Sequence, residues 1–165
     1  MVTIVTGKVN SGKSTTLLHH YEKHLNGDGF IAIKKMVDHV HYGFNLMRLS
    51  LGNTLPWMVH QNYYHNDFDK TMKFGPYYLN LDLLDLVEEV TDEMLEQQVS
   101  PIYVDEVGVL ELNGGGYHNI IRKILKSGTD LIIAVRDDLV QPVLTYFEIK
   151  DYELIQAQRE EQTHV

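Results

Sequence analysis

The chain has 165 residues, of which 44% are hydrophobic and 22% charged, so it can form the core of one domain of ordinary size. Its 14 lysines and arginines against 23 aspartates and glutamates give a net charge of -9, which argues against nucleic acid or an anionic membrane as the main partner. Cysteine is absent, which excludes disulfides, thiol catalysis and cysteine-based zinc sites.

The first part of the chain predicts a strand, a helix and a second strand. Residues 2–6 are a β-branched run of strand length that stops at Gly7. Leucines and a tyrosine then recur at helical spacing from Lys13 to Leu25, and the glycine-rich turn 26–29 ends that helix. Residues 30–37 return to strand composition, so the opening is a βαβ unit.

The middle of the chain is less regular. Residues 43–50 and 55–62 predict two strands around the turn 51–54, followed by an aperiodic loop over 63–73 and a short strand over 74–79. This block, from about residue 38 to residue 80, interrupts the alternation of strands and helices. We interpret it as a small β-hairpin insertion within one domain.

The second half returns to alternating elements. Asn80 can cap the first helix, and Asp137 or Asp138 can cap the last. The predicted elements are a helix over 83–94, a strand over 101–104, a helix over 117–125, a strand over 131–135, a helix over 140–147 and a strand over 152–155. Such alternation predicts an α/β fold, a three-layer α/β/α sandwich with a mainly parallel sheet. We expect a single domain over 1–155 and a polar C-terminal tail over 156–165.

The segment 7–14 reads GKVNSGKS and matches G-x-x-x-x-G-K-[ST], the phosphate-binding P-loop. Its glycines let backbone N–H groups point at phosphate oxygens, and the following helix adds its positive N-terminal end. Lys13 is expected to reach the β- and γ-phosphates. An ordinary glycine turn is disfavoured, because the match follows a strand and opens a helix. The predicted nucleotide-binding residues are Gly7, Lys8, Val9, Asn10, Ser11, Gly12, Lys13, Ser14 and Thr15.

A second acidic element follows the strand over 101–104, which ends in Asp105 and Glu106. The carboxyl ends of parallel strands meet at one edge of a sheet, so this pair is expected beside the P-loop. We predict that Ser14 and Asp105 hold Mg²⁺ and that Glu106 is the catalytic group that activates water. The alternative is an acidic strand end exposed to solvent.

A resemblance to a known family rests on several segments. Residues 105–108 and 111–112 follow the pattern D-E-[IV]-G-x-x-E-L, Gly43-Phe44 resembles a G-F segment, and 75–80 resembles G-x-Y-x-V-[DN]. These features, in consistent order from Met1 to about Phe147, are similar to the THEP-type nucleoside-triphosphatases. That resemblance implies a P-loop NTPase fold and hydrolysis of nucleoside triphosphates with weak base preference. The chain departs from the usual pattern at Ser14 in place of threonine, at Val109-Leu110 in place of a basic residue, and at Lys8 after the first glycine.

Two arginines and one lysine are further candidates for contacts to phosphate. Arg136 ends a predicted strand and is assigned to the catalytic group with Glu106 and Lys13, and Arg48 in the insertion is the second candidate. Lys8 either lies on the surface beside the phosphates or, as in dimeric P-loop ATPases of the MinD kind, enters a partner's nucleotide site.

Histidines and aromatic residues give weaker signals. His39 and His41 alternate along the chain, as metal ligands on a strand can, yet surface positions are the simpler interpretation. The aromatic residues of the inserted block either stack on a nucleobase or pack the insertion against the sheet; they are Trp57, Tyr63, Tyr64 and Phe68. The cluster 114–116 is interpreted as a mobile glycine connection.

The sequence therefore predicts a cytoplasmic, Mg²⁺-dependent nucleoside-triphosphatase that converts NTP into NDP and phosphate. The alternatives are a P-loop kinase for a small molecule or a nucleotide, and a nucleotide-dependent switch acting on a protein partner. The expected partner is the nucleoside triphosphate, without membrane, with nucleic acid disfavoured, and with a protein partner or a homo-oligomer left open.

Overall fold

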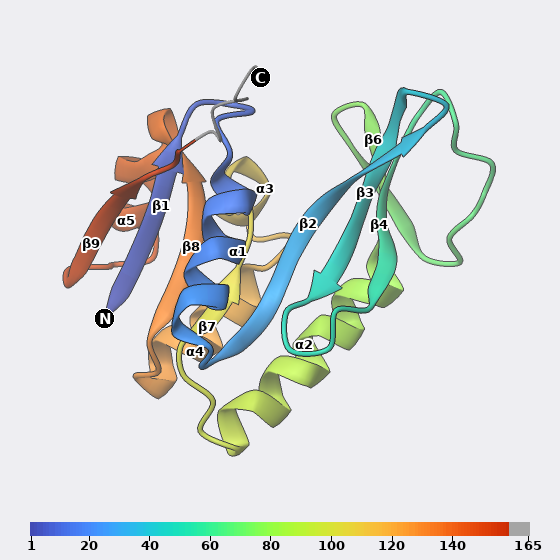
Figure 1. The fold of residues 1–165 in the computed structure, drawn as a ribbon. Coiled ribbons are helices and arrows are strands. Elements are labelled where there is room, and N and C mark those ends of the chain that lie inside the picture. Colours follow the sequence, from blue (N-terminus) through green and yellow to red (C-terminus); the bar gives the residue numbers. More distant parts are fainter. Residues whose placement is uncertain (159–165) are drawn as a thin grey trace.

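The computed structural model describes residues 1–158, whose strands join in one mixed sheet of nine strands (Figure 1). Five neighbouring strands run parallel and are, in sheet order, β2 (Asp28–Val37), β7 (Ile102–Val104), β8 (Leu131–Arg136), β1 (Val2–Gly7) and β9 (Tyr152–Gln156). All of β1 and β7 is buried, as apolar parallel strands covered on both faces are. The α/β fold with a parallel core is therefore confirmed.

The block predicted as an insertion extends the sheet beyond β2 with antiparallel strands. In chain order these are β3 (Val40–Arg48), β4 (Thr54–His60), β5 (Thr71–Phe74) and β6 (Tyr77–Asn80), and the full strand order is β5-β6-β4-β3-β2-β7-β8-β1-β9. The block thus contains more than one hairpin. The loop predicted over 63–73 is wrong at its end, because β5 begins there and pairs with β6. Thr71 to Phe74 alternate polar and apolar residues, a short strand signal that the loop prediction overlooked, and all four residues are exposed.

Helices cover the two faces of the sheet unequally (Figure 1). The helix α1 (Lys13–His24) lies on one face, and the other face carries α2 (Leu81–Glu96), α4 (His118–Ser127) and α5 (Val140–Tyr146). Two shorter elements, α3 (Val109–Leu112) and the 3-10 turn η1 (Asp137–Leu139), lie between these elements in the chain. The arrangement is the predicted three-layer sandwich.

One of the two predicted helix caps is present in the structure. The Asn80 side chain accepts a hydrogen bond from the Leu83 backbone N–H at 3.3 Å, so Asn80 caps α2 as predicted. The prediction that Asp137 or Asp138 caps the last helix is wrong. Those residues form the η1 turn ahead of α5, and Asp138 binds Arg136 instead.

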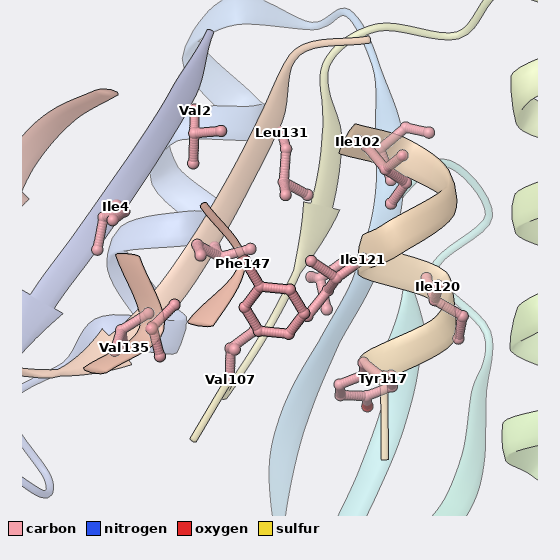
Figure 2. Close-up of a cluster of buried hydrophobic side chains, with 14 of the residues drawn as sticks. Val2, Ile4, Ile102, Val107, Tyr117, Ile120, Ile121, Leu131, Val135 and Phe147 are labelled. Atoms are coloured by element: carbon pink, nitrogen blue, oxygen red, sulfur yellow. The ribbon is translucent and has the colours of Figure 1, made fainter. Parts of the chain in front are cut away.

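The larger core lies between the sheet and the face that carries α2, α4 and α5. Figure 2 shows Phe147 reaching between Val107 and Ile121, with Tyr117 at the start of α4 on the same side. Each large apolar side chain buried there stabilises the fold by roughly 1.5–3 kcal/mol. Val107 belongs both to this core and to the loop after β7, so packing anchors the segment that follows Asp105 and Glu106.

Residues 159–165 of the predicted polar tail lie outside the described part of the chain. Gln156 ends β9, and the Ala157 backbone N–H donates to the Thr6 carbonyl at 2.8 Å. No helix within residues 1–158 is long and apolar enough to cross a membrane.

Candidate active site

The P-loop connects the carboxyl end of β1 to the start of α1. Asn10 and Gly12 adopt left-handed backbone conformations with φ of 60° and 87°, which bend the loop back over the helix start. The first turn of α1 has no side-chain cap, so its N–H groups are available to an anion. A Cβ at Gly7 would lie 2.3 Å from Ser11 Oγ, so a larger residue at this position would have to displace the Ser11 side chain.

Lys13 is buried inside the loop at 6% exposure. Its Nζ donates to the Lys8 carbonyl at 2.8 Å and lies 3.5 Å from the Gly7 carbonyl. These are neutral backbone acceptors, and no carboxylate is paired with Lys13 among the salt bridges of the described residues. The ammonium group is therefore held at the loop with its charge unneutralised, as binding of a polyphosphate requires.

Ser14 and Asp105 are 91 residues apart in the chain and come together in the fold. The Ser14 hydroxyl donates to Asp105 Oδ2 at 2.6 Å, and the Ala32 backbone N–H donates to the same oxygen at 2.9 Å. Asp105 is 1% exposed. Burial raises the pKa of Asp105 to about 6, although the hydrogen bonds from Ser14 and Ala32 favour the ionised form.

The other oxygen of the Asp105 carboxylate indicates that Ser14 and Asp105 could bind a cation. Asp105 Oδ1 is buried and has no hydrogen-bond partner among the described residues. A buried carboxylate oxygen without a partner is costly, and a hard divalent cation would remove that cost. A hydroxyl and a carboxylate are oxygen donors of the kind Mg²⁺ prefers. These two residues therefore fit the metal that the sequence predicted, and the described chain shows no cluster of three or more acidic or histidine ligands elsewhere.

Glu106 follows Asp105 but has a different environment. Its backbone is left-handed, with φ of 57°, an unfavourable conformation for a residue with a Cβ. This turn keeps Glu106 exposed while Asp105 is buried. The next N–H, that of Val107, donates to the Ala134 carbonyl at 2.9 Å, so the unusual conformation is fixed by a continuing contact with β8.

Glu111 is a buried carboxylate that the sequence placed in a family pattern without a role. It accepts hydrogen bonds from the Gly108 N–H at 2.8 Å and the Tyr117 N–H at 3.1 Å, and it is 3% exposed. Burial raises its pKa to about 7, against the effect of those hydrogen bonds. Glu111 thus ties the start of α3 to the start of α4.

The glycine cluster over 114–116 wraps this carboxylate. A Cβ at Gly116, whose φ is +53°, would lie 2.0 Å from Glu111 Oε2. The Gly114 N–H donates to the Glu111 carbonyl at 3.1 Å. The interpretation of this segment as a simple mobile connection misses these contacts, which hold the segment against the buried Glu111 carboxylate.

The basic candidates differ in position. Arg136 lines the cavity next to the P-loop, and its guanidinium binds Asp138 at 3.0 Å. Arg48 is the wrong candidate for phosphate, because it forms a 2.9 Å ion pair with Asp28 at the start of β2, away from the carboxyl ends of the strands. Lys8 is exposed and contributes its carbonyl to Lys13, which leaves both interpretations of its side chain open.

Two adjoining hollows open at this edge of the sheet. The wider cleft, of about 630 Å³, is lined by residues 9–15 of the P-loop. The narrower cavity, of about 250 Å³, lies between the P-loop and the inserted strands. Lys13, Ser14 and Glu106 line both. Two of the three predicted catalytic groups, Lys13 and Glu106, therefore lie where the two hollows meet, whereas Arg136 lines only the narrower cavity.

Aromatic residues of the insertion and His41 pack against neighbouring rings, whereas His39 is exposed. His41 Nε2 is 2.8 Å from the Tyr77 hydroxyl, and burial, followed by the charge of Lys34, lowers the pKa of His41. Tyr64 stacks on Tyr78 with ring centroids 4.2 Å apart. Trp57 is 3% exposed and lines the narrower cavity.

Comparison with known proteins agrees with this geometry. A family model described as NTPase matches residues 2–165. The chain belongs to this NTPase family. The prediction of a THEP-type family member and of an NTP hydrolase is confirmed at that level.

Individual relatives have low sequence identity to this chain, but the matches cover most of both sequences. The nucleoside-triphosphatase THEP1 of Thermotoga sp. (strain RQ2) is 24% identical over 163 residues, which cover 96% of this chain and 89% of the relative. The Sulfolobus acidocaldarius protein of the same name is 28% identical, and the match covers 79% of this chain and 74% of the relative.

Two solved structures share the fold. The crystal structure of THEP1 from the hyperthermophile Aquifex aeolicus has a TM-score of 0.65 and 19% identity, and covers 96% of this chain and 90% of its own. The solution structure of a human cancer-related nucleoside triphosphatase has a TM-score of 0.66 and 19% identity, with 96% and 89% covered.

Proposed function

We propose that this NTPase hydrolyses nucleoside triphosphates to the diphosphate and phosphate in an Mg²⁺-dependent reaction. The observation that carries the proposal is the 2.6 Å contact between Ser14 and Asp105, with a buried, unpartnered carboxylate oxygen beside it. The triphosphate lies along the P-loop in the wider cleft, with its terminal phosphate at the junction lined by Lys13 and Glu106. The name of the two relatives described above, nucleoside-triphosphatase THEP1, supports the same reaction.

The bound metal, held by Ser14 and Asp105, would supply positive charge that stabilises the phosphate oxygens. Lys13 exchanges its backbone acceptors for phosphate oxygens and neutralises charge on the leaving group. Glu106 takes a proton from a water molecule as that water attacks the γ-phosphorus, and the bond to the bridging oxygen breaks. Exposure of Glu106 lets the carboxylate return the proton to solvent.

Base selectivity is proposed to be weak. Strong discrimination needs polar groups built to hydrogen-bond the edge of one base, and the sequence contains no N-K-x-D motif of the GTPase kind. The absence of cysteine is in keeping with a reducing compartment, and we propose a cytoplasmic location.

The test is phosphate release from the purified protein with ATP, GTP, CTP and UTP, each with Mg²⁺ and with excess EDTA. We expect hydrolysis of all four, with specificity constants within about a hundredfold of each other, and loss of activity in EDTA. Equal rates with and without the metal would overturn the assignment of Ser14 and Asp105. A preference beyond about a thousandfold would show a dedicated base site.

A further inference from the structure

The narrower cavity is larger than hydrolysis by water requires. It has a volume of about 250 Å³, whereas one water molecule needs only roughly 15 Å³ by this kind of measure. Its volume lies just below the roughly 300 Å³ at which pockets for drug-sized ligands begin. The space therefore suits an organic molecule of modest size in addition to the attacking atom.

The walls of this cavity are mainly apolar and come from elements far apart in the chain. Phe44 and Trp57 belong to the inserted strands, Leu110 belongs to α3, and Leu139 belongs to the turn before α5. Apolar walls favour burial of an apolar ligand at about 25 cal/mol for each Å² removed from water. Apolar walls do not stabilise a bound water molecule in this way.

The charged residues that line the cavity disfavour an anionic ligand. Asp105, Glu106 and Glu111 line the cavity with carboxyl groups. Of the two cations that line it, Lys13 belongs to the phosphate loop, and Arg136 is bound to Asp138. An anionic acceptor would lie beside carboxylates without a free cation to neutralise it. A neutral ligand avoids this repulsion.

We infer that the narrower cavity is a second-substrate site for a small, neutral, apolar alcohol, which makes the protein a phosphotransferase as well as a hydrolase. This inference rests on the proposed function for the position of the triphosphate. The alcohol oxygen takes the place of the attacking water and forms a bond to the γ-phosphorus. The bond from that phosphorus to the bridging oxygen breaks, the diphosphate leaves with the electron pair, and the hydroxyl proton passes to Glu106. The product is a phosphate monoester.

The assay uses benzyl alcohol as the acceptor, with ATP and Mg²⁺, and follows products by ³¹P NMR. The readout is the ratio of benzyl phosphate to inorganic phosphate. The matched charged acceptor is 4-(hydroxymethyl)benzoate, which has the same hydroxyl and one added carboxylate. We expect benzyl phosphate to form, with a ratio roughly tenfold or more above that of the charged acceptor, because a buried unpaired charge is unfavourable.

Two valine variants test whether transfer uses this cavity. Val109 is 45% exposed and lines the cavity, whereas Val37 is 43% exposed at the end of β2 and does not. V109F fills space in the cavity and is expected to lower the ratio about tenfold. V37F makes the same chemical change elsewhere and is expected to leave the ratio unchanged.

Tryptophan fluorescence gives a second measurement that needs no variant. Trp57 is the single tryptophan of the chain and lines the cavity, so benzyl alcohol is expected to change its emission with a saturable dependence on concentration. Hydrolysis without any benzyl phosphate, together with unsaturable emission, would overturn the second-substrate site while the proposed function stands. An equal ratio in V109F and the parent would also overturn it. Absence of both products would instead contradict the proposed function.

Discussion

The buried acid Glu111 should make the stability of this protein depend on pH, and Glu111→Gln isolates that dependence. Burial raises the pKa of Glu111 from its ordinary 4.5 to about 7. The folded state therefore binds more protons than the unfolded state between these values, so the free energy of unfolding falls as pH rises through that range. At 1.36 kcal/mol for each pKa unit, the loss is about 3 kcal/mol.

The variant resembles the protonated form of the wild-type side chain at every pH. Neither has a charge. Glutamine keeps one acceptor oxygen, but its NH₂ group replaces the other, and Gly108 and Tyr117 donate to different oxygens of Glu111. E111Q should therefore be less stable than the wild type at pH 4 by the cost of one lost hydrogen bond, about 1–3 kcal/mol, and this cost does not change with pH. At pH 8 the wild type alone has the buried charge, so the variant should have gained about 3 kcal/mol relative to it. Asp105 titrates in both proteins, and its effect cancels in the difference.

The assay is urea denaturation of both proteins at several pH values between 4 and 8, in the absence of nucleotide and Mg²⁺. Glu93→Gln is the matched control, because Glu93 is exposed on α2; its effect should stay within about 0.5 kcal/mol at each pH. A difference between E111Q and wild type that stays constant from pH 4 to pH 8 would refute the reasoning about burial.

Two further predictions concern the glycines and the P-loop. Gly116→Ala should destabilise the fold by more than about 3 kcal/mol, because the added methyl group meets the Glu111 carboxylate. Gly114→Ala meets open space and should cost about 1–2 kcal/mol from its positive φ alone. Thermal melting compares the two variants, and equal losses would contradict the close contact between Gly116 and Glu111. Lys13→Ala should abolish nucleotide binding in calorimetry while circular dichroism stays unchanged, and retained affinity would refute the P-loop assignment.

The sequence predicted the parts of the site that depend on local chemistry. The P-loop, Asp105 and the Asn80 cap each need particular residue types at fixed spacing, and a single chain displays them. The parallel core followed from the alternation of apolar strands with helices. The motifs involve residues close together in the chain, and the alternation of strands and helices repeats along it, so both can be recognised in one sequence.

The parts that were missed depend on contacts in the folded chain or on a short sequence signal. Strand β5 has only four residues, all exposed, and pairs with β6 in a local hairpin across residues 75–76. The role of Glu111 depends on two backbone N–H groups from different elements. Arg48 had no local sign that Asp28 would bind it at the other end of the sheet. The contacts of Glu111 and Arg48 have no pattern in the sequence, whereas the hairpin of β5 and β6 is local and its alternation of polar and apolar residues was visible.

The proposed mechanism assigns different roles to Asp105 and Glu106, and the two side chains have different environments. Asp105 is buried against Ser14, whereas Glu106 is exposed where the two hollows meet. Asp105→Asn should weaken Mg²⁺-dependent nucleotide binding as well as the rate, because a metal contact also stabilises the bound ground state.

The most direct test is the turnover of Glu106→Gln measured together with its nucleotide affinity. Glutamine keeps the size of the side chain but loses its basicity, while Lys13, Ser14 and Asp105 remain. We predict ATP affinity within about threefold of the wild type and hydrolysis slower by roughly 10²- to 10⁴-fold. Hydrolysis at a rate near that of the wild type would contradict the assignment of Glu106 as the group that activates the attacking water.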